Sequence, residues 1–332
     1  MPRLTLSELE ALAANALHAA GASVAMAASA ARCLVAADAQ GLGTHGVSRI
    51  PTYVAHLMSG RALGGAVPRI VREPRPAACL VDAGNGLAFG ACELAVSAAC
   101  TRARRQGVAV AGVTNSHHCG ALGVLLAPVA AAGMVGLAFS NAPAAIMPWG
   151  GKRPLLGTNP VAAVFPRRNG EPITIDLSLT QVTRGQIMLL ANAGKPVPEG
   201  WGMDSDGKPT TDPQKILVGG SLHAVGGLKG AMLALAVEIL CCALTGAALS
   251  HEVESLHLGE GHPLRLGQLF MVINPGALAG DAVYMQRVET LVEAMLEDEG
   301  VRLPGARRDA MRDAAQNNGI EIDDRLYREL NP

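Results

Sequence analysis

Apolar residues recur at helical spacing in the first part of this chain. The pattern predicts helices over residues 5–20 and about 23–39, and a third over residues 47–60. Thr5 and Ser7 are the possible N-caps of the first helix, because a hydroxyl side chain can accept a hydrogen bond from a free backbone N–H. The sequence therefore predicts a helical N-terminal layer.

Short runs rich in apolar and β-branched residues then alternate with longer runs at helical spacing. The short runs predict strands at residues 78–83, 108–113, 134–140, 161–166, 173–178 and 268–275. The longer runs predict helices at residues 87–105, 121–133, 181–194, 229–246 and 281–298, and the fourth of these is expected to be buried. Residues 195–213 predict a loop by composition. This alternation predicts an α/β fold, with a strand–helix–strand unit over residues 108–140.

Two apolar stretches imitate membrane spans. Residues 119–149 contain no charged side chain, but Pro128 and Pro143 divide them into shorter pieces. Residues 231–249 contain Glu238 near their centre, where a carboxylate is costly in lipid. Buried elements of a soluble core explain both stretches better, so we expect no membrane partner.

Composition narrows the class of protein further. The chain has 332 residues, of which 49% are hydrophobic and 17% charged, enough for about two domains with a large core. A net charge of −1 and an aromatic content of 3% give no basis for nucleic-acid binding. The seven cysteines form no C-x-x-C motif, their number is odd, and no secretory signal is recognisable, so we expect a cytoplasmic protein.

Residues 41–49, GLGTHGVSR, match the glycine fingerprint of a Rossmann dinucleotide turn. That turn requires a strand before the glycines and an acidic residue about 20 positions later. The preceding segment predicts a helix, and no Asp or Glu occurs between Asp38 and Glu73. The glycines are therefore better interpreted as a flexible lead into His45 and Arg49.

His45 and Arg49 are four residues apart, so on a helix they would share a face. A histidine can donate a proton near neutral pH, and an arginine can bind a carboxylate through two parallel hydrogen bonds. The pair suits reduction of a C=O or C=N bond beside a carboxylate. A surface His–Arg pair without function is the alternative.

Residues 116–123, SHHCGALG, lie between a predicted strand and a predicted helix. Free backbone N–H groups at the start of that helix would attract phosphate. His117, His118 and Cys119 suggest zinc, but adjacent residues rarely converge on one ion, and we expect no metal. A structural turn is the remaining alternative.

Two other segments contain candidate chemistry. HEVESLH, residues 251–257, is not a zinc-protease motif, since its two histidines are six positions apart and about 240° around a helix. We interpret it as a solvated surface stretch. WGGKRPLLGTNPVAAVFP, residues 149–166, predicts tight turns that either are structural or close over a ligand, where Thr158 and Asn159 would contact substrate.

Six motifs occur in one order along nearly the whole chain: HGVSR, SHHCGA, PWGG, LGTNP, GGLKG and RLPG. Together they resemble the malate/lactate/sulfolactate dehydrogenase family that is unrelated to the Rossmann-type enzymes of those names. ALTGA, GQLFMVINP and RLPGARR are most similar to the Δ1-piperideine-2-carboxylate/Δ1-pyrroline-2-carboxylate reductases of that family. Those enzymes use NADPH to reduce cyclic imines to L-pipecolate and L-proline.

The resemblance implies a non-Rossmann α/β fold that binds NAD(P), a homodimer, and specific roles for residues. His45 corresponds to the proton donor and Arg49 to the residue that binds the substrate carboxylate. Positions that match cofactor contacts are His118, Cys119, Gly120, Ala121, Leu122, Asp176, Leu177, Ser178, Lys229, Arg302, Arg307 and Arg308. Because the last three could face a 2′-phosphate, we expect NADPH, with NADH possible. The expected domains are residues 1–105 with 280–332, for substrate and dimerisation, and residues 106–279, for the cofactor.

Two positions depart from the family pattern around the catalytic histidine. Thr44 replaces the usual serine but keeps the hydroxyl. Gln186 stands where the imine reductases have an acidic residue that orients the histidine, and an amide stabilises imidazolium less than a carboxylate does. The main hypothesis is cyclic-imine reduction. The alternatives are a 2-hydroxy acid dehydrogenase and a nucleotide-binding protein without redox activity.

Overall fold

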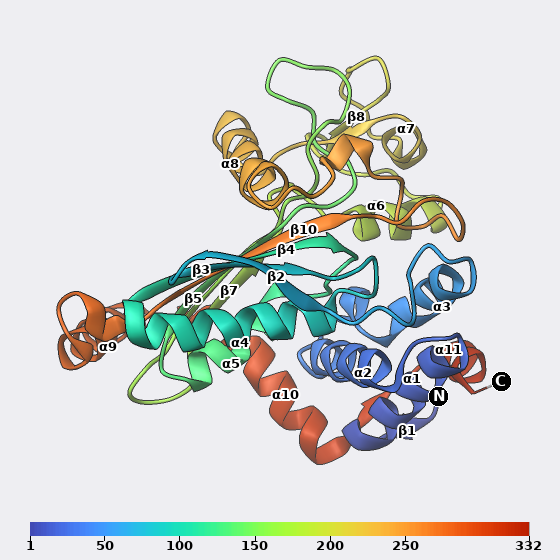
Figure 1. Ribbon diagram of the computed structural model, residues 1–332. Coiled ribbons are helices and arrows are strands. Elements are labelled where there is room, and N and C mark those ends of the chain that lie inside the picture. The colour runs from blue at the N-terminus through green and yellow to red at the C-terminus, as the bar shows by residue number, and fades with distance from the viewer. Residues whose placement is uncertain (332) are drawn as a thin grey trace.

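One seven-stranded mixed sheet forms the centre of the structure, a computed structural model in which residues 1–331 are described (Figure 1). The strands run in the order β2 (Arg69–Arg75), β3 (Ala78–Asp82), β4 (Val108–Ser116), β10 (Leu266–Ile273), β5 (Val135–Ser140), β6 (Val161–Phe165) and β7 (Ile173–Leu177). Only β3 and β4 pair in parallel, and every other neighbouring pair is antiparallel. A Rossmann sheet is mostly parallel, so the predicted non-Rossmann α/β fold is confirmed.

Strand β10 lies at the centre of the sheet although it comes late in the sequence. Phe270 aligns with Ala111 of β4 on one side and with Ala138 of β5 on the other. The strand is apolar except for Gln268, and most of it is buried. A near-continuous apolar run is what a strand covered on both faces requires.

Helices cover both faces of the sheet. Figure 1 shows α4 (Phe89–Gln106) and α5 (Leu122–Ala131) below it, and α8 (Leu228–Glu238) above it. The face of α4 toward the sheet consists mainly of alanines and cysteines, whose small side chains let the helix pack closely. Helix α5 connects β4 to β5, which confirms the predicted strand–helix–strand unit.

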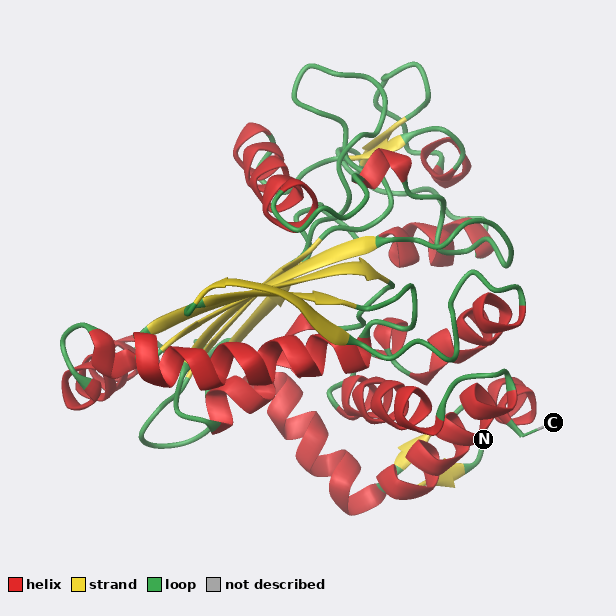
Figure 2. Cartoon of the chain, viewed as in Figure 1, coloured by secondary structure: helices red, strands yellow, loops and turns green. Residues whose placement is uncertain are grey.

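The N-terminal helices form a separate layer with its own apolar core. It contains α1 (Leu6–Ala19), α2 (Val24–Ala39), α3 (Ile50–Met58) and α11 (Asp324–Leu330), as Figure 2 shows. The Thr5 side chain accepts from the Glu8 N–H and the Glu8 carboxylate accepts from the Thr5 N–H, which fixes the start of α1. The helices predicted over residues 5–20 and 23–39 are confirmed.

The remaining elements lie at the margins of the sheet and of the N-terminal helical layer. The paired strands β1 (Arg3–Leu4) and β11 (Ile320–Glu321) bring the two ends of the chain together beside α10 (Ala306–Asn318). The other elements are α6 (Arg184–Asn192), β8 (Gly202–Met203), α7 (Pro213–Leu217), β9 (Ser221–Leu222) and α9 (Asp281–Leu296). Among residues 1–331, no helix is both long enough and apolar enough to cross a membrane.

Two features differ from the expectations. The segment 229–246 is helical as far as Ala243, through α8 and the π-helical turn that follows it (Ile239–Ala243), but it is not wholly buried, because one side is exposed. Strand β2 was not predicted, because its sequence RIVREPR is charged, as suits an exposed edge strand. The division into two domains stays a prediction, although β2, β3 and α4 pack with β4 across its boundary at residue 105.

Candidate active site

His45 and Arg49 lie on two consecutive 3₁₀ turns, Gly43–His45 and Val47–Arg49, that lead into α3. The prediction that they share a face of one α-helix is therefore wrong. The turns are held by the Arg49 Nε–H, which donates to the Thr44 carbonyl at 2.6 Å, and by the Ser48 hydroxyl, which donates to the Gly43 carbonyl at 2.5 Å. Both candidate residues thus belong to one short, internally bonded segment.

The glycines of this segment serve packing. The predicted helix before them is α2, so the strand of a dinucleotide turn is absent, as expected. A side chain on Gly46 would overlap the Asp38 carboxylate, which accepts the Val47 N–H at 2.7 Å. Gly41 has a φ of +73° and faces Met311 of α10. Burial raises the pKa of Asp38 to about 6. The hydrogen bond from Val47 to Asp38 holds the turn against α2. The sequence analysis missed this role of Asp38.

One nitrogen of His45 is already engaged. The Thr44 hydroxyl lies 3.0 Å from Nδ1, which leaves Nε2 to meet a substrate. Burial, with the charges of Arg49 and Arg308, lowers the pKa of His45 to about 4. The imidazole is therefore neutral at pH 7 in the free protein.

His118 faces His45 from the loop between β4 and α5. The two ring centroids are 5.6 Å apart, and the wholly buried Tyr53 hydroxyl lies 2.7 Å from Nδ1 of His118. Burial lowers the pKa of His118 well below its usual value, and His45 and Arg49 add to the effect. The structure thus brings together His45, Arg49 and His118. Tyr53, which the sequence analysis missed, holds His118 in place.

His117 has different partners from its neighbour. Its Nε2 lies 2.8 Å from Nδ1 of His56, and Nε2 of His56 lies 2.8 Å from the Leu258 carbonyl. His117 is 1% exposed, so it belongs to the interior. His117 therefore has a structural role in the interior, whereas its neighbour His118 faces His45.

Asp176 ties three elements together beside this loop. Its carboxylate accepts the Gly123 N–H of α5 at 3.0 Å, and Arg308 of α10 donates to its backbone carbonyl at 3.0 Å. Burial raises the pKa of Asp176, against the effect of Arg308. Of the next two residues, Leu177 is exposed and the Ser178 hydroxyl lies 3.1 Å from that of Thr180. The predicted cofactor segments at 118–122 and 176–178 are thus neighbours.

The residues around Asp176 and the start of α5 fit an anionic dinucleotide. Ala121, the N-cap residue of α5, has no side-chain acceptor, so the first N–H groups of the helix other than that of Gly123, which Asp176 accepts, lack a side-chain cap, and Cys119 is buried beneath the loop. Arg302 and Arg307 are exposed and form no ion pair within the described chain. Free N–H groups and unpaired guanidinium groups are the donors that phosphates need. Lys229 is also exposed, but it lies at the start of α8 on the other face of the sheet.

Of the two predicted substrate contacts in the 149–166 segment, Asn159 lies in the interior, and its role toward substrate stays a prediction. Its side chain is wholly buried and its amide donates to the Ala234 carbonyl at 2.8 Å and to Glu238 at 2.9 Å. Glu238 also accepts the backbone N–H and the hydroxyl of Ser250, at 2.6 and 2.7 Å. Asn159 therefore orders the interior in this structure. Thr158 is partly exposed, and its role stays a prediction.

We expect Glu238→Gln to lower the free energy of unfolding by about 2 kcal/mol, because the new NH₂ group would face donors that now reach a carboxylate oxygen. Chemical denaturation of both proteins measures the difference. Glu299→Gln, an exposed substitution, is the matched control. An equal midpoint for wild type and Glu238→Gln would contradict the assignment.

Gln186 lies in the first turn of α6, and its side chain is exposed. Its neighbour Gly185 approaches the catalytic turn, since a methyl group there would lie 3.8 Å from Cγ2 of Thr44. Among residues 1–331 the hydrogen-bonding side chain at Nδ1 of His45 is Thr44. The orienting role of Gln186 therefore stays a prediction.

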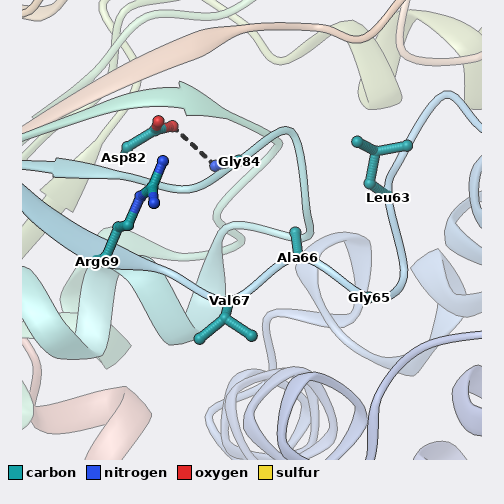
Figure 3. Close-up of a pocket in the computed structure, with 7 residues that line it drawn as sticks. All are labelled: Leu63, Gly65, Ala66, Val67, Arg69, Asp82 and Gly84. Atoms are coloured by element: carbon teal, nitrogen blue, oxygen red, sulfur yellow. Dashed lines mark hydrogen bonds between the residues drawn. The ribbon is translucent and has the colours of Figure 1, made fainter.

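A hollow of about 390 Å³ lies elsewhere, beside β2 and β3 (Figure 3). Its lining is Leu63, Gly65, Ala66, Val67, Arg69, Asp82 and Gly84. Asp82 accepts the Gly84 N–H at 2.8 Å, so that carboxylate stabilises the turn. The lining includes none of the candidate catalytic residues.

Comparison with known proteins identifies a family and relatives that span nearly the whole chain. Residues 4–331 match the malate/L-lactate dehydrogenase family. The chain is 42% identical to (2R)-3-sulfolactate dehydrogenase (NADP(+)) of Chromohalobacter salexigens, over 98% of this chain and 96% of that protein. It is 39% identical to the Δ1-pyrroline-2-carboxylate/Δ1-piperideine-2-carboxylate reductase of Pseudomonas putida, over 96% and 93%. The structure of Δ1-piperideine-2-carboxylate reductase from Pseudomonas syringae superposes with a TM-score of 0.93 at 36% identity, covering 99% of both chains.

Proposed function

Because the chain belongs to the malate/L-lactate dehydrogenase family, we propose that it uses NADPH to reduce Δ1-piperideine-2-carboxylate and Δ1-pyrroline-2-carboxylate to L-pipecolate and L-proline. The chain is an oxidoreductase, as are the relatives that span nearly its whole length. The observation that carries the proposal is the short segment that joins His45 to Arg49. It pairs a titratable acid with a guanidinium that has no carboxylate partner in the described chain.

Arg49 orients the substrate. Its Nε–H is taken by the Thr44 carbonyl, so its terminal nitrogens can bind both oxygens of the substrate carboxylate. His45 Nε2 then supplies a proton to the imine nitrogen, while bound NADPH supplies the hydride that C2 receives. His118 and Tyr53 restrict the opposite side of the site. Positioning and proton transfer together lower the barrier.

Proton donation requires a change of charge when substrate binds. With a pKa of about 4, His45 is mostly neutral in the free enzyme at pH 7. Burial is the largest cause of the lowered pKa of His45 and the charge of Arg49 is the next, and the substrate carboxylate offsets that charge. The bound substrate therefore favours the protonated His45 that reduction needs.

We expect the pH profiles of kcat and kcat/KM for reduction to differ. Both fall as pH rises, because the protonated His45 donates, but the midpoint of kcat should lie at a higher pH than that of kcat/KM. The reason is that kcat reports the complex, in which Arg49 is neutralised. Steady-state rates from pH 4 to 9 test this, after correction for the imine's own titration measured in solution. Coincident midpoints would contradict the coupling between Arg49 and His45.

A second candidate is a 2-hydroxy acid dehydrogenase in which His45 protonates a carbonyl oxygen. The 42% identity to a sulfolactate dehydrogenase and the neutral Gln186 favour it. NADPH oxidation compared across Δ1-pyrroline-2-carboxylate, Δ1-piperideine-2-carboxylate, pyruvate and oxaloacetate, at equal enzyme, separates the two. Higher kcat/KM for the imines supports the main proposal. Higher kcat/KM for the oxo acids overturns it in favour of the second.

The expected homodimer has a candidate surface on α8 and the π-helical turn after it. Large apolar side chains are exposed along this segment: Leu228, Met232, Leu233, Leu235, Ile239 and Leu244. A contiguous apolar surface of this kind is typical of an interface, and a two-fold dimer would cover it with the same surface of a second copy.

We expect Leu233→Asp to shift the protein from dimer toward monomer, because each interface would bury two unpaired charges. Light scattering coupled to gel filtration measures the molar mass. Val24→Asp places the same charge at another exposed apolar position, on α2, and should leave the mass unchanged. A dimer that survives Leu233→Asp would exclude this surface.

A further inference from the structure

The hollow beside β2 and β3 is a concave surface that lies apart from the candidate active site. Its volume of about 390 Å³ falls in the range of roughly 300–1,000 Å³ that small-molecule sites occupy. The apolar side chains of Leu63, Ala66 and Val67 line one part of it, and the charged side chains of Arg69 and Asp82 line another (Figure 3). Apolar walls with a few polar groups are the usual composition of a ligand site.

Arg69 and Asp82 are cross-strand partners that do not form an ion pair. They align in the register of β2 against β3, and Figure 3 shows the guanidinium and the carboxylate together on one side of the hollow. Opposite charges at such positions stabilise a sheet when they contact each other. Within residues 1–331 neither side chain forms an ion pair, with the other or with a third group. Both charges are therefore free to bind the opposite charges of a ligand.

The Asp82 carboxylate is held in place where its strand ends. Its Oδ1 accepts the Gly84 N–H at 2.8 Å and the side-chain N–H of Asn115 at 3.1 Å. Its Oδ2 accepts no hydrogen bond among residues 1–331. A fixed carboxylate with one free oxygen is a preorganised acceptor for an ammonium group, because little further order is lost when the group binds.

Glycines keep the backbone around the hollow open. Gly84 has a φ of +60°, a left-handed conformation that suits glycine. A side chain at Gly65 would meet no atom within 4 Å. Since Gly65 lines the hollow, a larger side chain at this position would occupy the hollow without displacing its neighbours.

Asn115 connects the hollow to the loop that contains His118. Its side chain donates to Asp82, and its carbonyl accepts the Asn85 N–H at 2.8 Å. Asn85 and Asn115 have φ values of +59° and +48°, which are uncommon for residues other than glycine and often mark functional sites. A ligand on Asp82 would therefore lie one hydrogen bond from a residue three positions before His118.

We propose that this hollow binds a small α-amino acid, with the amino group on Asp82 and the carboxylate on Arg69. At neutral pH such a ligand carries a cation and an anion attached to one carbon atom, which matches two opposite charges that share the hollow without contact. A ligand with a single charge would leave one of the two side chains without a partner. An apolar ligand side chain would lie against Leu63 and Val67. The site does not include His45 or Arg49, so this binding does not depend on the proposed reduction.

The first test is calorimetric titration of L-proline into Arg49→Ala protein, in which the proposed carboxylate contact of the active site is absent. L-Proline is the probe because it carries both charges and a small apolar ring. We expect saturable binding with a Kd of about 1 mM or lower. Pyrrolidine lacks the carboxylate and cyclopentanecarboxylate lacks the amino group, so each should bind at least about tenfold more weakly than L-proline.

Substitutions in the same Arg49→Ala background assign the binding to the hollow. Arg69→Gln removes the guanidinium and Gly65→Leu fills the space, and each should weaken L-proline binding at least about tenfold. Arg72→Gln removes the same charge from β2 outside the lining and should leave the Kd unchanged. Equal midpoints of thermal unfolding without ligand would show that the variants fold as the parent does.

The Gly84 amide gives a second readout in the wild-type protein. Because its N–H bonds to Asp82, its NMR resonance should shift as L-proline is added, and Arg69→Gln should abolish the shift. Absence of saturable binding would overturn the proposal, as would an unchanged Kd in Arg69→Gln. Equal affinity for cyclopentanecarboxylate would show an anion site only and would also overturn it. None of these results depends on turnover, so the proposed function stands or fails separately.

Discussion

Replacing His45 by alanine should lower kcat at least 100-fold, because the reduction loses the group that supplies a proton to the substrate nitrogen. The structure offers no good replacement for His45 as the proton donor. The nearby His118 is engaged with Tyr53 through Nδ1, and burial lowers its pKa well below the usual value. Water would have to supply the proton in the variant. The measurement is single-turnover NADPH oxidation at saturating imine, where cofactor release does not limit the rate.

Two controls separate a catalytic role of His45 from a structural one. His251→Ala removes an exposed imidazole and should leave kcat unchanged. NADPH affinity, measured by fluorescence titration, should change less than about threefold in His45→Ala. The reason is that the substitution should slow proton transfer rather than weaken cofactor binding. Near-normal turnover in His45→Ala would exclude it as the proton donor.

Replacing Arg49 by alanine should lower kcat/KM for the imine about 10³-fold. The variant loses a charged, two-point contact with the carboxylate, and such a contact contributes about 2–5 kcal/mol when one partner is removed. It also loses the hydrogen bond from Nε to the Thr44 carbonyl that braces the catalytic turn. Steady-state kinetics should therefore show a higher KM together with a lower kcat.

A graded series makes this prediction specific to the guanidinium. Arg49→Lys keeps the charge but loses the planar pair of donors, so its kcat/KM should fall between those of wild type and Arg49→Ala. Added guanidinium ion should partly restore Arg49→Ala and leave Arg75→Ala, an exposed control on β2, unaffected. Equal kcat/KM in Arg49→Ala and wild type would show that another group binds the carboxylate.

Much of the fold was predictable because the relevant information is local. The period of apolar residues predicts α1 and α2, and the short β-branched runs predict β4, β5 and the other buried strands, since side chains on one face must reach the core. The same reasoning failed for β2, where charges protect an exposed edge. It also failed for one side of α8, where large apolar side chains such as Leu233 are exposed, whereas Ala234 and Val237 on the other side are buried.

The sequence alone determined the class of the protein, most of its helices and buried strands, and the choice of His45 and Arg49 as candidate residues, because spacing and ordered motifs are properties of neighbouring positions. Only the tertiary structure decided what surrounds them. Position 46 has no room for a side chain because Asp38 lies against it, and β10 is central in the sheet because it pairs with both β4 and β5. The segment around Leu258 lies beside α3 because the Leu258 carbonyl bonds to His56, 202 positions away. Such contacts depend on how distant segments pack, and no local period encodes that arrangement.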